Sequence, residues 1–180
     1  MKSYFKTFKY YLLKEKSSFF VFILIQLFFL IILKKKIKYR IQLRNCNFIF
    51  NFLPSGIQTG SYGFFLLRQY YEPLLLNLDK LIKAGDTVLD IGSNQGIYTL
   101  AMSKIVKSKG TVIAVEPFTS MIKCLKNNLK INRVNNVKIY ENVIIEKVKK
   151  VKLFFNKGTV SASVNKNKKI KRFIFVNGVT

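Results

Sequence analysis

The sequence predicts an α/β protein built on a doubly wound parallel sheet, and three observations support that prediction. Two short apolar runs, 88–91 and 111–116, end on or beside an acid, and a third run follows at 137–140. Helical patterns separate the runs, at 97–106 and from residue 119 onward. Alternation of strand and helix favours parallel strands joined by right-handed crossovers. We therefore expect a Rossmann-like sheet with the three strands in the order 3-2-1.

The N-terminal segment, residues 1–44, is basic and contains an uncharged apolar run at 17–33. As a helix this run would be about 25 Å long, a little short of a hydrocarbon core of roughly 30 Å. Lysines lie on both sides of it, so the positive-inside rule favours a re-entrant or surface-lying helix over a crossing. A helix buried against the domain or in a dimer is the alternative. We expect the protein to be cytoplasmic and attached to the inner face of a membrane through this helix.

Residues 45–85 are expected to lead into the sheet. Apolar and polar side chains alternate between residues 37 and 60, which predicts one or two short strands. A leucine-rich helix then follows Glu72, because Pro73 suits a first helical turn and Gly85 suits the exit. This helix should run directly into the first strand of the sheet.

Residues 86–180 form the third predicted region, which begins with the strands and helices of the parallel sheet. After Asn142 no further helical pattern is present. Residues 143–155 and 173–176 are β-prone and contain many lysines, which predicts hairpin or edge strands. The lysine run at 147–152 is interpreted as a solvated strand edge.

The most specific motif is Asp-Ile-Gly-Ser-Asn-Gln-Gly, residues 90–96, directly after the first strand. Its glycines, Gly92 and Gly96, permit a tight turn and a close approach of a ligand to the backbone. An acid about 20 residues further on can hold a ribose, and Glu116 ends the second strand. Since the chain has only eight acids, the placement of Asp90 and Glu116 at two strand ends predicts a nucleoside-containing cofactor.

Amino-acid composition and net charge bear on whether the protein binds nucleic acid, holds a metal ion or contains disulfides. The chain has 32 Lys and Arg against 8 Asp and Glu, a formal net charge of +24. These basic residues are mostly Lys and are spread from end to end, which indicates a compositional bias, so we do not expect nucleic acid as a partner. Histidine is absent, and Cys46 and Cys124 lack a Cys-x-x-Cys spacing. We therefore expect no metal site and no disulfide framework, and the commonest general base is missing.

The form Asp-x-Gly-x-x-x-Gly resembles motif I of class I S-adenosylmethionine-dependent methyltransferases. A dinucleotide fold would need a second glycine at position 94, where Asn94 stands. The resemblance implies that the backbone at the glycines lies against the methionine part of S-adenosylmethionine and that the second acid, Glu116, takes both ribose hydroxyls. The residues that match the first motif are Asp90, Gly92, Ser93, Asn94 and Gly96.

Residues 70–178 are similar to the FkbM family of these methyltransferases in three further segments. These are Glu72-Pro73 before the leucine-rich helix, Val-Ile-Ala-Val-Glu-Pro-Phe ending at Phe118, and Asn-Asn-Leu-Lys-Ile-Asn at 127–132. The resemblance implies that Phe118 flanks the adenine or ribose, that Asn142 lies near the adenine, and that Glu72 contacts cofactor or substrate or caps its helix. Family members continue with a further strand on the reaction side, which is absent here, so the domain is expected to be partial.

The expected function is transfer of a methyl group from S-adenosylmethionine to a hydroxyl of a carbohydrate or glycolipid-type acceptor. No residue is identified as the catalytic base, and a homo-oligomer is compatible with the sequence. The alternatives are a catalytically inactive, membrane-attached interaction module that keeps the cofactor-binding fold, and a methyltransferase acting on nucleic acid. The second would bind RNA or DNA in a salt-sensitive way.

Overall fold

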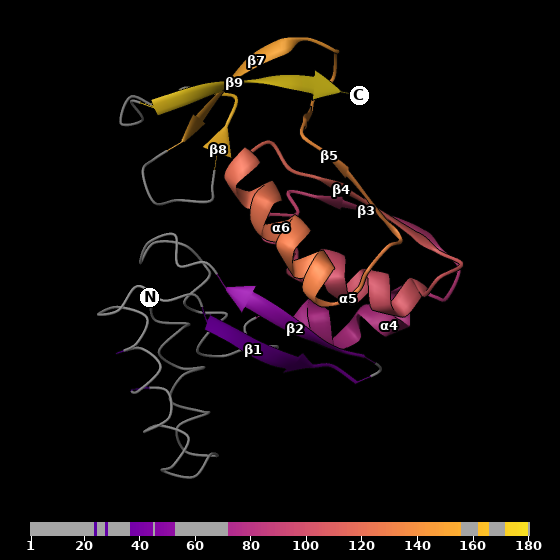
Figure 1. The fold of residues 1–180 in the computed structure, drawn as a ribbon. Coiled ribbons are helices and arrows are strands. Elements are labelled where there is room, and N and C mark those ends of the chain that lie inside the picture. The colour runs from indigo at the N-terminus through magenta and orange to yellow at the C-terminus, as the bar shows by residue number, and fades with distance from the viewer. Residues whose placement is uncertain are drawn as a thin grey trace.

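The computed structural model describes residues 37–44, 46–52, 72–155, 162–165 and 172–179, together with Leu24 and Phe28. The elements in these ranges, most of which are labelled in Figure 1, are the strands β1 (Ile37–Gln42), β2 (Asn47–Phe52), β3 (Thr87–Ile91), β4 (Thr111–Val115), β5 (Val137–Tyr140), β6 (Val143–Ile144), β7 (Lys150–Phe155), β8 (Ala162–Ser163) and β9 (Arg172–Val179), the helices α4 (Leu78–Leu81), α5 (Ile97–Val106) and α6 (Thr119–Ile131), and the 3₁₀ helix η2 (Pro73–Asn77).

The central sheet is parallel, with the strand order β3-β4-β5, so the predicted 3-2-1 arrangement is confirmed. Asp90 of β3 pairs with Ala114 of β4, and Val115 pairs with Tyr140 of β5. This register brings the carboxyl ends of all three strands to one edge of the sheet. The site predicted from the glycine motif therefore lies where three strand ends meet.

Helices α5 and α6 cover one face of this sheet, as Figure 1 shows. Two successive crossovers of the same hand, running in one direction across the sheet, place both helices on the same side. The opposite face carries the exposed side chains Leu89, Ile91 and Tyr140. A doubly wound fold needs helices on both faces, and within the described residues the second helical layer is not present. The prediction of a doubly wound sheet is therefore confirmed for the three parallel strands and for one of the two helical layers.

The predicted lead-in strands are confirmed as the antiparallel hairpin β1-β2. The hairpin packs on α5 and α6 from the side opposite the sheet, so the helices lie between two β layers (Figure 1). The core is continuous across these layers: Ile41 and Phe48 of the hairpin belong to the same buried cluster as Leu100 and Leu125 of the helices.

The side chains of Asn128 in α6 and of Asn132, the C-cap residue of α6, bind the backbone of strand β2 in the hairpin. Asn132 accepts a hydrogen bond from the Ile49 backbone N–H (2.7 Å) and donates one to the Ile49 carbonyl (2.6 Å). One turn earlier, Asn128 accepts from the Asn51 backbone N–H (2.8 Å) and donates to the Gln95 carbonyl in the glycine turn (2.9 Å). Asn128 is fully buried, so it links the hairpin, α6 and the glycine turn inside the core.

The segment after Glu72 differs from the single α-helix that its leucines predict. Its first turn is the 3₁₀ helix η2, and only the four residues of α4 are α-helical. Leu75 and Leu78 are both buried, and side chains three residues apart eclipse one another along a 3₁₀ helix, whereas in an α-helix they share a face but are offset. Burial of this pair against the core therefore favours the tighter helix.

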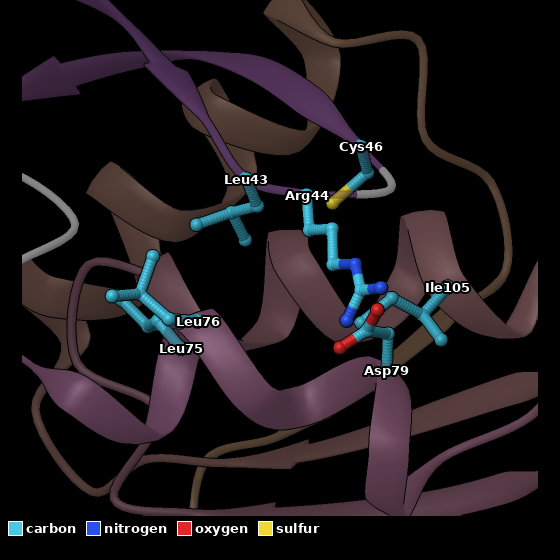
Figure 2. A pocket seen from close by; sticks show the side chains of 7 residues that line it. All are labelled: Leu43, Arg44, Cys46, Leu75, Leu76, Asp79 and Ile105. Atoms are coloured by element: carbon cyan, nitrogen blue, oxygen red, sulfur yellow. The ribbon is translucent and has the colours of Figure 1, made fainter.

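Seven side chains, shown in Figure 2, line a small pocket where the hairpin turn meets this segment. Arg44 and Asp79 extend toward one another across it, and Cys46 lies at one side. Burial raises the pKa of the Cys46 thiol to about 11. Apolar side chains, Leu43, Leu75, Leu76 and Ile105, form the rest of the lining.

The C-terminal β-prone runs form a second sheet with the order β6-β9-β7-β8. β7 is antiparallel to both β8 and β9, whereas β6 is parallel to β9. The prediction of hairpin strands after Asn142 is confirmed. One face of β7 packs toward α6, since Leu153 is buried and the Phe155 ring stands edge-on to Phe118 with centroids 5.2 Å apart.

No helix within the described ranges is long and apolar enough to cross a membrane. The hydrophobic run 17–33 lies outside the described residues except for Leu24 and Phe28, which are helical and exposed. Membrane association through this run stays a prediction.

Candidate functional site

The glycine turn between β3 and α5 wraps around the end of β4. The backbone N–H groups of Gly92 and Ser93 both donate to the Val115 carbonyl, at 2.8 and 3.1 Å, and Gly96 donates to Ser93 (2.8 Å). Gly92 and Gly96 have φ angles of 77° and 90°, in the left-handed region that glycine adopts at no steric cost. The turn is therefore closed by its own backbone and held against the second strand.

The two glycines serve different purposes. A Cβ on Gly92 would meet no atom within 4 Å, so this position faces open space beside the strand ends. A Cβ on Gly96 would lie 2.2 Å from Leu125 Cδ1 of α6. Gly96 thus permits α6 to pack on the turn, and the structure does not bring it to the open space at Gly92.

Asp90, the acid at the end of β3, turns toward the helices. Its carboxylate accepts a hydrogen bond from the Thr99 hydroxyl and another from the Thr99 backbone N–H. Only 9 % of Asp90 is exposed. Burial raises the pKa of this carboxyl, and the bonds from Thr99 counteract part of that rise. Asp90 therefore anchors the first turn of α5, from beneath the turn that a ligand would contact.

Glu116, directly after β4, occupies the centre of the strand ends. Its two carboxylate oxygens accept hydrogen bonds from the backbone N–H groups of Asn94 and Phe118, both at 2.9 Å. Burial raises the pKa of Glu116, while these two donors act in the opposite direction. Each oxygen retains acceptor capacity, because a carboxylate oxygen can accept two hydrogen bonds. A pair of hydroxyl donors, such as a ribose presents, suits that remaining capacity.

A crevice with about 620 Å³ of open space lies over Glu116, between the strand ends and the C-terminal sheet. Its polar side comes from the motif and its apolar side from the second sheet and the start of α6. The lining residues are Ile91, Gly92, Asn94, Val115, Glu116, Pro117, Phe118, Met121, Asn142, Val143, Ile144, Leu153 and Ala162.

The structure gathers five of the nine predicted site residues around this crevice: Gly92, Asn94, Glu116, Phe118 and Asn142. Phe118 begins α6, and the Asn142 side chain donates to the Asn177 carbonyl (3.3 Å).

The other four predicted residues do not line the crevice. Asp90 and Gly96 are buried below the turn, and Ser93 is buried within it. Glu72 instead accepts a hydrogen bond from the Tyr98 hydroxyl (3.0 Å). Burial and the neighbouring Glu72 raise the pKa of Tyr98.

Two buried polar atoms test whether the crevice suits the predicted cofactor. Asn94 Oδ1 and Ser93 Oγ have no hydrogen-bond partner among the described residues. An unpaired buried acceptor is costly, and Asn94 lines the crevice. Together with the free acceptor capacity of Glu116 and the open space at Gly92, the unpaired oxygen of Asn94 fits a ligand that carries hydroxyl or amino donors. The residues present therefore suit S-adenosylmethionine.

The apolar lining was not foreseen from the sequence. Val143 and Ile144 follow Asn142 directly, so their place could have been read from the strand end, but no local signal identifies Leu153 or Ala162. Those two residues reach the crevice because β7 and β8 fold back over α6. No cluster of metal-ligating side chains exists in the described part of the chain.

Comparison with known proteins finds methyltransferases that are similar to the part of the chain that holds this site. Residues 68–145 match the model of the protein-L-isoaspartate(D-aspartate) O-methyltransferase family. The chain is 35 % identical over 75 residues to the ribosomal protein L11 methyltransferase of Acetivibrio thermocellus. That match covers 41 % of the chain and 23 % of the relative, so the chain spans less than a quarter of the relative's length.

Solved structures of methyltransferases are also similar to part of this chain. A protein-L-isoaspartate O-methyltransferase is 29 % identical, covering 41 % of this chain and 23 % of that one, with a TM-score of 0.35. An S-adenosylmethionine-dependent methyltransferase from Aquifex aeolicus is 28 % identical, covering 39 % and 37 %, with a TM-score of 0.35. Because these scores are low, the assignment depends on the family model and the sequence relative.

None of these matches is to the FkbM family, so that finer resemblance is not shown. The motif, the strand order and the family match agree on the broader class and on its cofactor, S-adenosylmethionine. Residues 68–145 are therefore similar to the cofactor-binding segment of class I S-adenosylmethionine-dependent methyltransferases.

Proposed function

We propose that this chain binds S-adenosylmethionine in the crevice over Glu116 and serves methyl transfer to an oxygen nucleophile. The observation that carries the proposal is the Glu116 carboxylate, held by two backbone donors and still able to accept from two hydroxyls. The cofactor supplies a methyl group already activated on a sulfonium. The work left to the protein is therefore to align donor and acceptor and to keep water out.

Each part of the crevice has a role in this proposal. Glu116 would accept from the ribose hydroxyls, and Asn94 would offer its unpaired carbonyl oxygen to a donor of the ligand. The adenine would lie among the apolar side chains Val143, Ile144 and Leu153. Asp90 would act indirectly, because it positions the turn through Thr99.

An oxygen acceptor is supported by the family model, whose description is that of an O-methyltransferase. A hydroxyl on a carbohydrate or glycolipid is supported only by the resemblance of Glu72-Pro73 and the 112–118 segment to FkbM enzymes. A carboxyl oxygen of a protein, as the name of the matched family states for its members, is the competing acceptor. Activity is assigned by following S-adenosylhomocysteine formation with each class of acceptor; binding without turnover on any of them would favour the inactive interaction module.

Isothermal titration of the full chain with S-adenosylmethionine tests the cofactor site. Replacement of Glu116 by Ala removes hydrogen bonds to a charged group, worth about 1.5 to 3 kcal/mol each, so the dissociation constant should rise at least tenfold. Glu116→Gln should give a smaller loss, because the amide retains one acceptor oxygen. Glu146→Ala removes an exposed acid that does not line the crevice and is the matched control. Unchanged binding by the Glu116 variants, or preferential binding of a dinucleotide, would refute the assignment.

A further inference from the structure

The outer face of the C-terminal sheet carries lysines and phenylalanines in alternation. Side chains two residues apart on a strand share a face, as do residues directly paired across strands. β7 and β9 pair Lys152 with Phe175 and Phe154 with Phe173. Lys150, Lys152, Phe154, Phe173 and Phe175 therefore form one surface, which we call the Lys/Phe face.

This face is exposed and well organised. Phe173 is 46 % and Phe175 55 % exposed, and both lysines are exposed. The Phe173 and Phe175 rings stand edge to face with centroids 5.6 Å apart, and Phe154 lies 6.0 Å from Phe173. Such ring contacts fix side-chain positions, so the aromatic surface is ordered before any ligand arrives.

The lysine ammonium groups lie directly above the rings. Lys152 Nζ is 4.8 Å from the centroid of Phe173 and 5.6 Å from that of Phe175, and Lys150 Nζ is 5.5 Å from Phe175. The opposite face of the same strands is apolar and directed inward, with Leu153 lining the cofactor crevice. The two faces of one sheet thus differ in chemistry, and the Lys/Phe face has no part in cofactor binding.

We propose that the Lys/Phe face binds single-stranded nucleic acid. Sequence-tolerant binding of single strands combines aromatic side chains, on which bases stack, with cations that follow the phosphates. Phe173 and Phe175 supply the rings, and Lys150 and Lys152 place positive charge within 6 Å of them. The flexible lysine stems let each ammonium move from the ring to a phosphate when a base takes its place. Because lysines occur along the whole sequence, the sequence alone did not indicate this cluster of lysines and phenylalanines, which forms only when β7 and β9 pair.

Three ligands of the Lys/Phe face can be compared: a second copy of this chain, an anionic membrane and a nucleic-acid strand. A second copy of this chain would bring a molecule of formal charge +24 against the lysines. An anionic membrane satisfies the lysines, but their ammonium groups lie over the Phe173 and Phe175 rings and would separate these rings from the acyl chains. Bases present flat π surfaces of their own, with phosphates beside them, and match that arrangement. Neither stacking nor phosphate contact uses a 2′-hydroxyl, so RNA and DNA strands should bind alike.

Fluorescence anisotropy with labelled 12-mers of uridylate and thymidylate tests the proposal on the full chain. Phe173→Leu with Phe175→Leu keeps the apolar bulk and removes the π surfaces, and affinity should fall at least fivefold, since each stacked base contributes about 1–3 kcal/mol. Phe173→Tyr with Phe175→Tyr retains stacking and should bind as the parent does. These tyrosine variants keep the test valid if the leucine variant fails to fold.

A charge-matched pair separates this face from general basicity. Lys150→Gln with Lys152→Gln should reduce the steepness of log K against log salt by about 1.4, since each phosphate contact to a single strand contributes about 0.7. Lys123→Gln with Lys126→Gln removes the same charge from exposed positions of α6 and should leave the steepness unchanged.

Three results would overturn the proposal. The first is equal loss of affinity in both lysine pairs, which would indicate general attraction by a basic protein. The second is full oligonucleotide affinity in the leucine variant. The third is a leucine variant that loses binding to phosphatidylserine vesicles while its oligonucleotide affinity is unchanged, which would assign the face to a membrane surface. Retention of S-adenosylmethionine binding in every variant confirms that the fold is intact.

Discussion

Substitution of Gly96 by Ala should destabilise the protein far more than the same substitution at Gly92. Both glycines have positive φ, and forcing an L-residue into this conformation costs about 1–2 kcal/mol. The gain from a less flexible unfolded chain is the same for both variants and cancels when they are compared. What remains is the difference in what the new methyl group touches.

At Gly96 the added Cβ would lie 2.2 Å from Leu125 Cδ1, whose residue is fully buried. Relieving that overlap requires Leu125 to move inside a packed core, and overpacking of this kind costs about 1–3 kcal/mol. Gly96→Ala should therefore lower the free energy of unfolding by about 2–5 kcal/mol. Gly92→Ala, with no atom within 4 Å of its Cβ, should lose only about 1–2 kcal/mol.

Urea denaturation followed by circular dichroism measures both losses, and titration with S-adenosylmethionine should show the reverse order. Gly92→Ala places a methyl group in the crevice and should weaken binding more than Gly96→Ala does at a concentration where both are folded. Adding Leu125→Ala to Gly96→Ala should give a combined loss smaller than the sum, with a coupling of about 1–3 kcal/mol. Equal destabilisation by the two glycine variants, or strict additivity with Leu125→Ala, would refute the packing role of Gly96.

Three further predictions concern other buried groups. Asn128→Ala should lower the free energy of unfolding by about 2–4 kcal/mol, because it removes the buried side chain that binds both the Asn51 backbone N–H and the Gln95 carbonyl, whereas exposed Asn127→Ala on the same helix should change it by less than about 0.5 kcal/mol. Burial raises the pKa of Glu116 above 4.5, so the folded state binds the extra proton and the free energy of unfolding should fall as pH rises from 4.5 through the folded pKa. Glu116→Gln should flatten that dependence in urea melts at several pH values, and a slope unchanged by the substitution would argue against it. With its pKa near 11 against an ordinary 9.0, Cys46 should react with iodoacetamide at pH 8 about a hundredfold more slowly than after unfolding, as peptide mass spectrometry would measure.

The order of the parallel strands and the central position of Glu116 followed from the sequence, because apolar runs, glycine positions and terminal acids are local signals. The role of Gly96 did not follow. Its neighbour Leu125 lies on a different helix, and a motif resembling known cofactor turns favoured a ligand contact over a packing contact. A glycine needed for ligand approach and one needed for helix packing look the same in a sequence.

Asp90 and Glu72 illustrate the same limit for charged residues. Thr99, the partner of Asp90, is a buried polar residue in an otherwise apolar helical pattern, which was a sign that a strand-end acid pointed inward. The partner of Glu72 is Tyr98, whose ring packs against the core while its hydroxyl donates to the Glu72 carboxylate. The apolar half of the crevice depends on long-range strand pairing through β7, for which the sequence contains no local signal.

Asn128 and Asn132, at the C-terminal end of α6, bind β2 because the spacing of residues along the helix matches the spacing along the strand. Four residues along a helix advance about 6.0 Å, and two residues along a strand advance roughly 6.6–6.8 Å. Asn128 and Asn132 meet Asn51 and Ile49 at these matching intervals. Adding or deleting a single residue between Asn128 and Asn132, or between Ile49 and Asn51, would prevent the two sets of hydrogen bonds from forming together. We therefore expect insertions and deletions in the hairpin to fall between the end of β1 at Gln42 and the start of β2 at Asn47.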